Sequence, residues 1–262
     1  MTAFGWGTLP IALKGLLAAT DPFTITWFRF VISALLLGCL RPLDFLAAIR
    51  LRGSSLLLLA AAAGGLGGSY IMYILALGLL TPSTTQIVIQ LSPTCVLFGS
   101  LLIFKEPFGN RRRFGFLVLA IGMALFFNRR FDELLGGVND LTTGILLLVG
   151  AALGFSLFAL CQKQLLGAVS STAIMFPLFL AGSLFFAPVA QPSQLLELQG
   201  PHTALLASCA ASTLISFMAY STAMRHLETS RVSVVTATAP LFTILGMALA
   251  APLAPDLFAA EA

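Results

Sequence analysis

Two apolar stretches of this 262-residue chain each carry a proline near the middle, among polar side chains that could bind a small molecule. The first, IVIQLSPTCVLFG, covers residues 87–99, and the second, VVTATAPLFTILG, covers residues 234–246, so that their prolines lie 147 positions apart. A proline inside a helix removes a backbone hydrogen bond and costs about 3 kcal/mol. In lipid, an opened helix is stable only where neighbouring groups or a water-filled cavity satisfy the backbone. We therefore expect Pro93 and Pro240 to border a cavity.

Polar residues accompany both prolines at helical spacing, so that they form one stripe on each helix. Polar side chains in membrane helices avoid lipid. A kink used for packing, or hydrogen bonds between helices, would also explain the two stripes. We favour cavity lining, because both stripes flank the freed carbonyl groups. The stripes comprise Ser83, Gln86, Gln90, Pro93 and Thr94 in the first stretch and Ser233, Thr236, Pro240 and Thr243 in the second.

Two cations, Lys14 and Arg29, lie within apolar segments, each roughly 10 Å from the loop at residues 18–22 if a helix rises 1.5 Å per residue. A cation in the bilayer costs about 2.5–3.5 kcal/mol on insertion scales and usually faces the interior or a pathway. Lys14 could instead snorkel to the interface, and Arg29 could cap helix carbonyl groups. We expect the pair to form a positive spot that binds a carboxylate or another electron-rich substrate group. Trp6, on the helical face of Lys14, would add an aromatic surface.

The other reactive residue types form no catalytic or metal-binding pattern. The sequence has no HExxH motif and no Asp or Glu inside an apolar segment, and its four cysteines occur singly. The basic residues lie in short loops and not on one face with aromatic residues, which argues against nucleic-acid binding. We therefore predict that the protein is not an enzyme and has no catalytic residue, metal ligand or cofactor.

The composition predicts an all-α integral membrane protein. Hydrophobic residues make up 58% of the chain and charged residues 9%, whereas a soluble domain has about 25% charged residues. A helix needs about 20 apolar residues to cross the hydrocarbon core of a bilayer. Apolar runs predict nine spans, at residues 1–18, 22–40, 54–79, 82–104, 114–127, 142–162, 171–190, 203–224 and 230–251.

Two glycine pairs predict close helix packing. Gly64 and Gly68 are four residues apart in the third span, as are Gly150 and Gly154 in the sixth. Small residues at this spacing allow two helix backbones to approach, and we expect the approach to occur within the bundle.

The distribution of basic residues predicts the orientation in the membrane. Cytoplasmic loops carry the excess of Lys and Arg. With the N-terminus in the cytoplasm, the inner loops hold ten of these residues and the outer loops only two, Arg129 and Arg130. We therefore expect a cytoplasmic N-terminus and, after nine spans, a C-terminus on the outer side.

The second half of the sequence repeats the first. Tyr73 recurs as Tyr220, 147 positions later, and Trp6 is matched by Phe155, 149 positions later. Each copy would contain five spans, and because five is odd the second copy must enter the membrane from the opposite face. This arrangement is an inverted repeat, whose substrate sites lie near the membrane midplane between the copies. The predicted units are residues 1–128 with five spans and residues 142–262 with four.

Several segments resemble the EamA family of the drug/metabolite transporter superfamily: WGTLPIALK at residues 6–14, PFTITWFRF at 22–30, the segment 73–93 and FKE at 104–106. The similarity extends from Phe4 to about Gly246. It implies a ten-helix bundle of two five-helix repeats that exports small metabolites, often amino acids or drugs. The tail APLAPDLFAAEA stands in place of the last helix of that bundle, so we expect nine of the ten helices.

These observations predict a secondary transporter of the bacterial inner membrane that moves an amino acid-like or drug-like metabolite by alternating access, with efflux as the expected direction. The alternatives are a membrane-embedded enzyme and a non-transporting membrane subunit. The expected partners are the small-molecule substrate and the lipid bilayer. The predicted substrate-binding residues are Trp6, Lys14, Arg29, Tyr73, Gln86, Gln90, Pro93, Phe155, Tyr220, Thr236 and Pro240.

Overall fold

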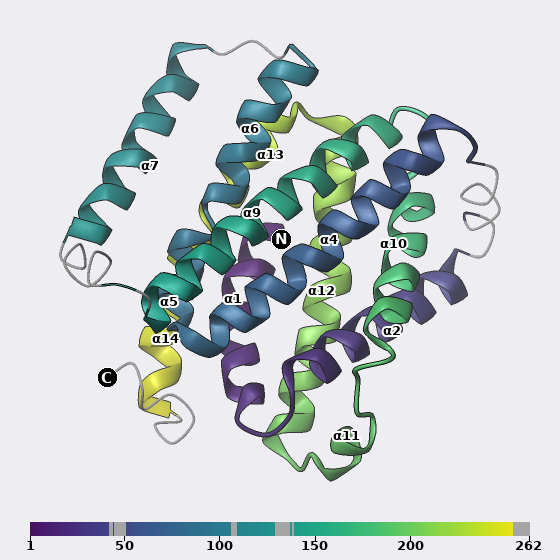
Figure 1. Ribbon diagram of the computed structural model, residues 1–262, viewed down its shortest axis with the longest axis vertical. Coiled ribbons are helices and arrows are strands. Elements are labelled where there is room, and N and C mark those ends of the chain that lie inside the picture. Colours follow the sequence, from purple (N-terminus) through teal and green to yellow (C-terminus); the bar gives the residue numbers. More distant parts are fainter. Residues whose placement is uncertain (42–43, 45–50, 106–108, 129–136, 138, 254–262) are drawn as a thin grey trace.

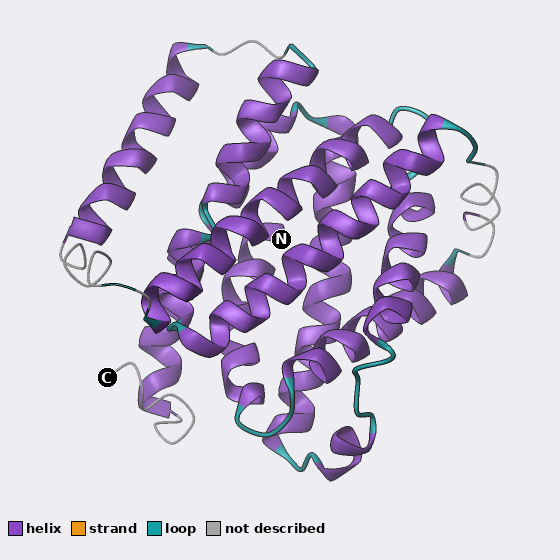
Figure 2. Cartoon of the chain, viewed as in Figure 1, coloured by secondary structure: helices purple, strands orange, loops and turns teal. Residues whose placement is uncertain are grey.

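The computed structural model describes residues 1–41, 44, 51–105, 109–128, 137 and 139–253. Within these ranges the chain forms helices, turns and loops and has no strand (Figures 1 and 2). Glu106 of the FKE motif and the tail after residue 253 lie outside the described residues. The helices are α1 (Thr2–Leu17), α2 (Pro22–Leu40), α4 (Ser54–Leu79), α5 (Pro82–Val88), α6 (Leu91–Ile103), α7 (Asn110–Asn128), α9 (Asp140–Leu165), α10 (Ser171–Phe186), α11 (Ser193–Glu197), α12 (Pro201–His226), α13 (Thr229–Thr236) and α14 (Ala239–Leu253).

Polar residues just before the apolar runs begin several of these helices. Asp21 precedes α2, and its Oδ1 accepts hydrogen bonds from the backbone N–H groups of Phe23 and Thr24, each at 2.9 Å. Pro22 follows at the first helical position, where a missing N–H has no cost. Such caps satisfy backbone donors that the helix itself leaves open. The side chains of Thr81, Asn139 and Ser170 cap α5, α9 and α10 in the same way.

Helices occupy each of the nine segments that the sequence predicted to be apolar spans. Among the described residues, six helical stretches are long and apolar enough to cross a membrane: Pro22–Leu40, Ser54–Leu79, Asp140–Leu165, Pro201–His226 and the two interrupted stretches Pro82–Ile103 and Thr229–Leu249. Shorter apolar helical stretches are Ser171–Phe186 and Arg113–Gly122. An all-helical multi-pass membrane protein is therefore confirmed, and the count of nine crossings stays a prediction.

The segment after α10 departs from the predicted span. The sequence predicted a span to residue 190, but α10 ends at Phe186, and a short helix, α11, follows in the connection to α12. This connection is attached to the turn between α1 and α2. The Oε1 atom of Gln194 accepts hydrogen bonds from Thr20 Oγ1 at 2.7 Å and from the backbone N–H of Asp21 at 3.0 Å.

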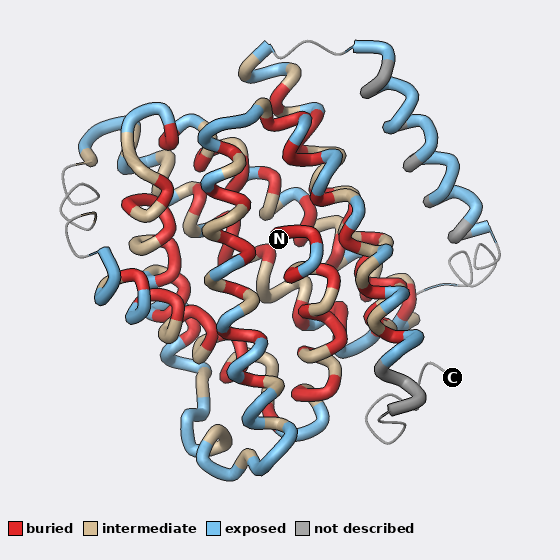
Figure 3. The backbone as a smooth tube through the Cα atoms, turned by 180° about the vertical axis from the view of Figure 1, so that it is seen from behind, coloured by how far each residue is buried: buried red, intermediate tan, exposed pale blue. Residues whose placement is uncertain are grey.

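The helices pack in pairs that repeat between the two halves of the chain. α4 packs along α9, and α1 packs along α12; residues of α1 and α4 correspond to residues of α9 and α12 at the sequence offsets of 149 and 147. Helices α2 and α10, which correspond to each other, pack together. Figure 1 shows α7 at the edge of this bundle, and its described side chains are exposed (Figure 3).

Close glycine packing occurs between α4 and α9, although on one side it involves a different glycine from the predicted one. A Cβ atom added at Gly154 would lie 2.8 Å from the carbonyl oxygen of Gly65 and 3.2 Å from the backbone nitrogen of Ser69. A Cβ atom at Gly64 or Gly68 would meet no atom within 4 Å. The prediction for Gly154 is therefore confirmed, and that for Gly64 and Gly68 is wrong, because no neighbouring helix packs closely against these two residues.

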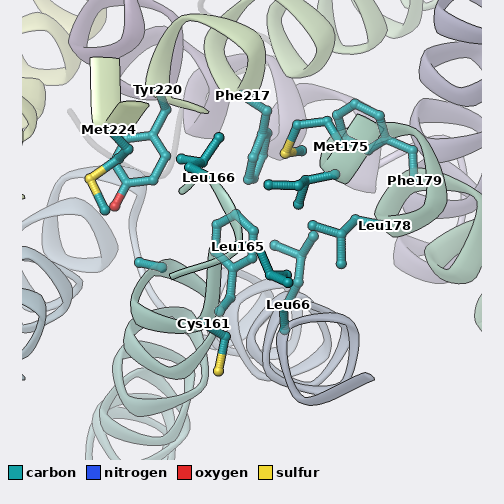
Figure 4. Close-up of a cluster of buried hydrophobic side chains, with 14 of the residues drawn as sticks. Leu66, Cys161, Leu165, Leu166, Met175, Leu178, Phe179, Phe217, Tyr220 and Met224 are labelled. Atoms are coloured by element: carbon teal, nitrogen blue, oxygen red, sulfur yellow. The ribbon is translucent and has the colours of Figure 1, made fainter. Parts of the chain in front are cut away.

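The described buried apolar residues form three clusters inside the bundle, whereas many large apolar side chains remain on the outside (Figure 3). The largest buried cluster combines aliphatic and aromatic residues of α2, α4, α9, α10 and α12, including Leu66, Leu178 and Phe217 (Figure 4). Exposed residues such as Leu57 and Leu184, at 73% and 66% of their full accessibility, would face lipid. In lipid, an apolar exterior has no cost, because the lipid tails are as apolar as these side chains.

Candidate functional site

Both proline-containing stretches are interrupted helices. The first ends as α5 at Val88 and restarts as α6 at Leu91, and the second ends as α13 at Thr236 and restarts as α14 at Ala239. Each break comes just before the proline, which has no N–H to donate to a carbonyl of the preceding turn. At the first break, Ile89 O accepts a hydrogen bond from the backbone N–H of Ser92 at 2.8 Å, three residues on. The predicted opening of both helices is confirmed.

A cavity of about 110 Å³ lies between the two interrupted helices and the helices α1, α4, α9 and α12. Its volume is similar to that of engineered cavities of about 150 Å³ that hold benzene. The cavity therefore has room for a small molecule on the scale of one aromatic ring. Its walls are formed by Trp6, Leu9, Ser69, Tyr70, Tyr73, Gln86, Ile89, Gln90, Ser92, Pro93, Phe155, Phe217, Tyr220, Ser233, Thr236 and Ala239.

Most wall residues occur as pairs at the two sequence offsets, one member from each half of the chain. The cavity therefore lies where the two halves of the sequence meet. The pairs are Trp6 with Phe155, Tyr70 with Phe217, Tyr73 with Tyr220, Gln86 with Ser233, Ile89 with Thr236, and Ser92 with Ala239.

Aromatic rings form one continuous wall of the cavity. The ring of Trp6 lies 5.4 Å from that of Phe155, 5.3 Å from that of Phe217 and 5.1 Å from that of Tyr220, measured between centroids. The rings of Tyr70 and Phe217 lie 6.1 Å apart. Separations of 4.5–7 Å in edge-on or tilted geometry are favourable for aromatic pairs. This wall offers an apolar ligand a firm stacking surface.

Other wall residues carry buried polar atoms that have no hydrogen-bond partner among the described residues. Gln90 is only 3% exposed; its Nε2 donates to Gln86 O at 3.2 Å, while its Oε1 accepts no hydrogen bond. Ser92 Oγ is also buried without a partner. Buried polar atoms are normally hydrogen-bonded, so such exceptions point to a ligand or to water. Both residues line the cavity, Gln90 at the break between α5 and α6 and Ser92 in the first turn of α6.

Arg29 lies behind the cavity wall. Its side chain is fully buried; Nε donates to Thr213 Oγ1 at 2.7 Å and Nη2 donates to the Tyr70 hydroxyl at 3.2 Å. The guanidinium carbon lies 5.2 Å from the centre of the Tyr70 ring, a cation–π distance. Tyr70 lines the cavity, so this one side chain contacts both Arg29 and the cavity.

Lys14 caps a helix and does not line the cavity. Its Nζ donates to the carbonyl oxygens of Leu77 and Leu80, at 3.0 and 3.3 Å, at the C-terminal end of α4. A cation at this end of a helix is stabilised by the helix dipole. Lys163 makes the matching contacts at the end of α12, donating to the carbonyl oxygens of Met224 at 2.6 Å and Leu227 at 2.8 Å.

The structure thus brings most of the predicted binding residues to one cavity. Lys14 binds carbonyl oxygens at the end of α4 and Arg29 binds Thr213 and Tyr70, and neither cation is among the described wall residues. Pro240 is not part of the wall, although its neighbour Ala239 is. The predicted residues that line the cavity are Trp6, Tyr73, Gln86, Gln90, Pro93, Phe155, Tyr220 and Thr236.

Sequence reasoning missed several wall residues, of which Tyr70 and Phe217 are the most informative. Tyr70 precedes Tyr73 by three residues, so a helix places both side chains on nearly the same face. Phe217 is found 147 positions after Tyr70. Helical spacing combined with the repeat would have found both. No comparable signal marks Ser69 or Ser92.

A family model described as the EamA-like transporter family matches residues 1–128 and 142–251, and so most of the chain. The chain belongs to the EamA-like transporter family. Its sequence is 36% identical over 264 residues to a protein of Haemophilus influenzae named an uncharacterized transporter, covering 99% of this chain and 85% of that protein. It is 33% identical over 262 residues to the uncharacterized inner membrane transporter YhbE of Escherichia coli, covering 98% of this chain and 81% of that one.

The fold of this EamA-like protein also occurs in a solved structure. A crystal structure aligns with a TM-score of 0.74 at 20% sequence identity, covering 99% of this chain and 92% of the other. At this identity the likeness shows the shared fold. Together with the family match, the apolar helices identify a multi-pass bacterial membrane protein of a transporter family.

Proposed function

We propose that this EamA-like protein is a secondary transporter that exports a small organic molecule across the cytoplasmic membrane by alternating access. The cavity between the interrupted helices is the proposed substrate site. The observation that carries the proposal is the pairing of its wall residues between the two halves of the chain. A site made by two related halves can be exposed to either side by equivalent movements of the two halves.

The proposed topology is an inverted repeat. The interrupted helices support it, since α5 packs against α14 and α6 packs against α13, so that the two breaks lie side by side. The matching caps of Lys14 on α4 and Lys163 on α12 support it as well. In this topology the N-terminus is cytoplasmic, the cap by Lys14 lies on the outer side and the cap by Lys163 lies on the inner side.

Reporter fusions test the proposed orientation. A fluorescent protein that matures only in the cytoplasm should be bright when it follows Arg52 and dark when it follows Gln199. An alkaline phosphatase, which is active only outside the cytoplasm, should give the reverse pattern at the same two positions. The opposite result with both reporters would refute the orientation.

Flux measurements test the transport activity. Growth of cells with and without the protein, under raised concentrations of amino acids, analogues and dyes, would first identify compounds to which the protein gives resistance. The purified protein in liposomes should then move such a compound across the bilayer with saturation. Purified, folded protein that moves none of the resistance compounds would contradict the proposal.

Proton coupling through buried carboxylates is not expected, because no Asp or Glu lies inside a predicted span. Proton relays in membranes usually use such groups. We propose a facilitator or exchanger. Accumulation of substrate driven by an imposed pH gradient alone would contradict this part of the proposal.

A further inference from the structure

A polar group of three residues adjoins the cavity on one side. It consists of Arg29 on α2, Tyr70 on α4 and Thr213 on α12, joined by the two hydrogen bonds of the guanidinium. The Nη1 atom of Arg29 is buried and has no hydrogen-bond partner among the residues that the structure describes. Within the part of the chain that the structure describes, no carboxylate pairs with Arg29. A buried charge without a counter-charge is strongly unfavourable, which points to a partner other than the described residues.

The equivalent place in the other half of the chain is apolar. At the sequence offsets of 149 and 147, the positions of Arg29, Thr213 and Tyr70 correspond to Leu178, Leu66 and Phe217. Figure 4 shows these three apolar residues together in the buried cluster. Packing at this place therefore does not require charge. The cavity therefore has a charged polar group on one side and an apolar group at the equivalent place on the other side.

The hydroxyl of Tyr70 is polarised by its hydrogen bond with Arg29. A guanidinium can only donate, so the Tyr70 oxygen must accept the hydrogen bond from Nη2. The O–H of Tyr70 is then left to donate to another acceptor, and Arg29 is the only hydrogen-bond partner of this hydroxyl among the described residues. Tyr70 lines the cavity, so that acceptor can be a bound ligand.

We infer that Tyr70, with the charge of Arg29 behind it, binds the acid group of a small organic anion, and that this contact fixes the orientation of the substrate. This inference rests on the proposed function and names its substrate class. The ligand would place its acid group against Tyr70 and its apolar body against Trp6 and Phe155. A charge-assisted contact of this kind is stronger than one between neutral groups. The wall has no described carboxylate that could bind a cationic group.

Binding of three matched probes tests the charge requirement. Benzoate, benzamide and benzylamine share an aromatic ring of the size that the cavity admits and differ in charge. Trp6 lies in the wall and can report binding through its fluorescence once Trp27, the only other tryptophan, is replaced by Phe. In purified protein, we expect benzoate to bind about tenfold or more tightly than benzamide, and benzylamine to bind most weakly.

Substitution of Tyr70 tests the residue assignment. Tyr70→Phe reproduces the ring that stands at the equivalent position 217, so the fold should be retained. It should weaken benzoate binding about tenfold while changing benzamide binding less than about threefold. Arg29→Lys keeps a cation and should retain part of the preference for benzoate. If Arg29→Leu alone fails to fold, the variant Arg29→Leu/Thr213→Leu/Tyr70→Phe copies the apolar group of the other half.

Three results would overturn the inference: equal affinity for benzoate and benzamide, unchanged benzoate affinity in Tyr70→Phe, or no binding of any probe. These measurements need no transport. The proposed transport activity is tested separately by flux in liposomes. Saturable flux of neutral or cationic compounds without preference for anions would support the proposed transport activity and contradict the inferred anion site.

Discussion

The two halves of this chain have equivalent lysine side chains where these bind backbone carbonyl oxygens, but they have different side chains next to the cavity. Lys14 and Lys163 bind carbonyl oxygens at equivalent helix ends, with the same two acceptors in each half. Arg29, by contrast, has Leu178 at its equivalent position. A backbone carbonyl is present whatever the side chain, so both halves can keep the same cap. The cavity wall has no such constraint, and one half can become polar while the other stays apolar.

The close contact between α4 and α9 should give the largest difference in stability between equivalent substitutions in the two halves. Gly154→Ala would press a methyl group against backbone atoms of Gly65 and Ser69, which cannot rotate away. The equivalent change, Gly5→Ala, meets chiefly the hydroxyl of Ser216, which can. We expect Gly154→Ala to destabilise by about 1–3 kcal/mol and Gly5→Ala by less.

Thermal unfolding in one detergent measures both glycine variants, with Gly64→Ala as the control because its added methyl group meets no atom within 4 Å. The midpoint should fall in the order Gly154→Ala, Gly5→Ala, Gly64→Ala. A larger loss in Gly5→Ala than in Gly154→Ala would show that the two contacts are not governed by backbone proximity.

The prolines allow a comparison of the two breaks by activity. Pro93 lies in the cavity wall, whereas Pro240 lies beside it. Alanine restores a backbone N–H and favours a continuous helix, so we expect Pro93→Ala to reduce flux about tenfold and Pro240→Ala to reduce it less. Flux per folded molecule in liposomes is the measurement, and equal loss of flux and of folded yield would indicate that the prolines serve packing alone.

The two lysine caps can be compared by measuring how accessible the cavity wall becomes when each cap is removed. Removing the cap on one side should loosen that side of the bundle, because each charged hydrogen bond contributes about 1.5–3 kcal/mol. With the native cysteines replaced, Gln86→Cys and Ser233→Cys place equivalent labels in the two halves of the wall. We expect Lys14→Met to increase labelling at position 86 and Lys163→Met to increase labelling at position 233, each several-fold. An increase at the same position in both variants would refute the idea of two opposed caps.

The helix starts at α5 and α13 give the smallest expected difference. Thr81 caps α5 by accepting from the backbone N–H of Thr84 at 3.3 Å, whereas the equivalent Glu228 forms an exposed ion pair with Arg231 at 3.4 Å. Thr81→Ala should destabilise by about 1 kcal/mol, and Arg231→Ala by less than about 1 kcal/mol. The midpoints of thermal unfolding would measure this, and a greater loss in Arg231→Ala would contradict the ranking.

The sequence by itself determined the helical segments, the two breaks and about half of the cavity wall. Helices α2, α5 and α9 begin directly after Asp21, Thr81 and Asn139 because these side chains accept hydrogen bonds from the first turn. Pro93 and Pro240 open their helices wherever those helices pack, since the missing N–H is a local property. The repeat then relates Trp6 to Phe155 and Tyr73 to Tyr220 without any coordinates.

The tertiary structure alone decided what the two cations do. Both were predicted from their apolar surroundings to share one positive spot, but their partners lie far away in the sequence. Lys14 binds carbonyl oxygens of α4, and a backbone acceptor leaves no mark in the sequence. Arg29 donates to Thr213, 184 positions away, and only the packing of α2 against α12 and α4 brings it behind Tyr70. Side-chain chemistry fixed which contacts each cation could make, and the fold selected one capping role and one role at the cavity.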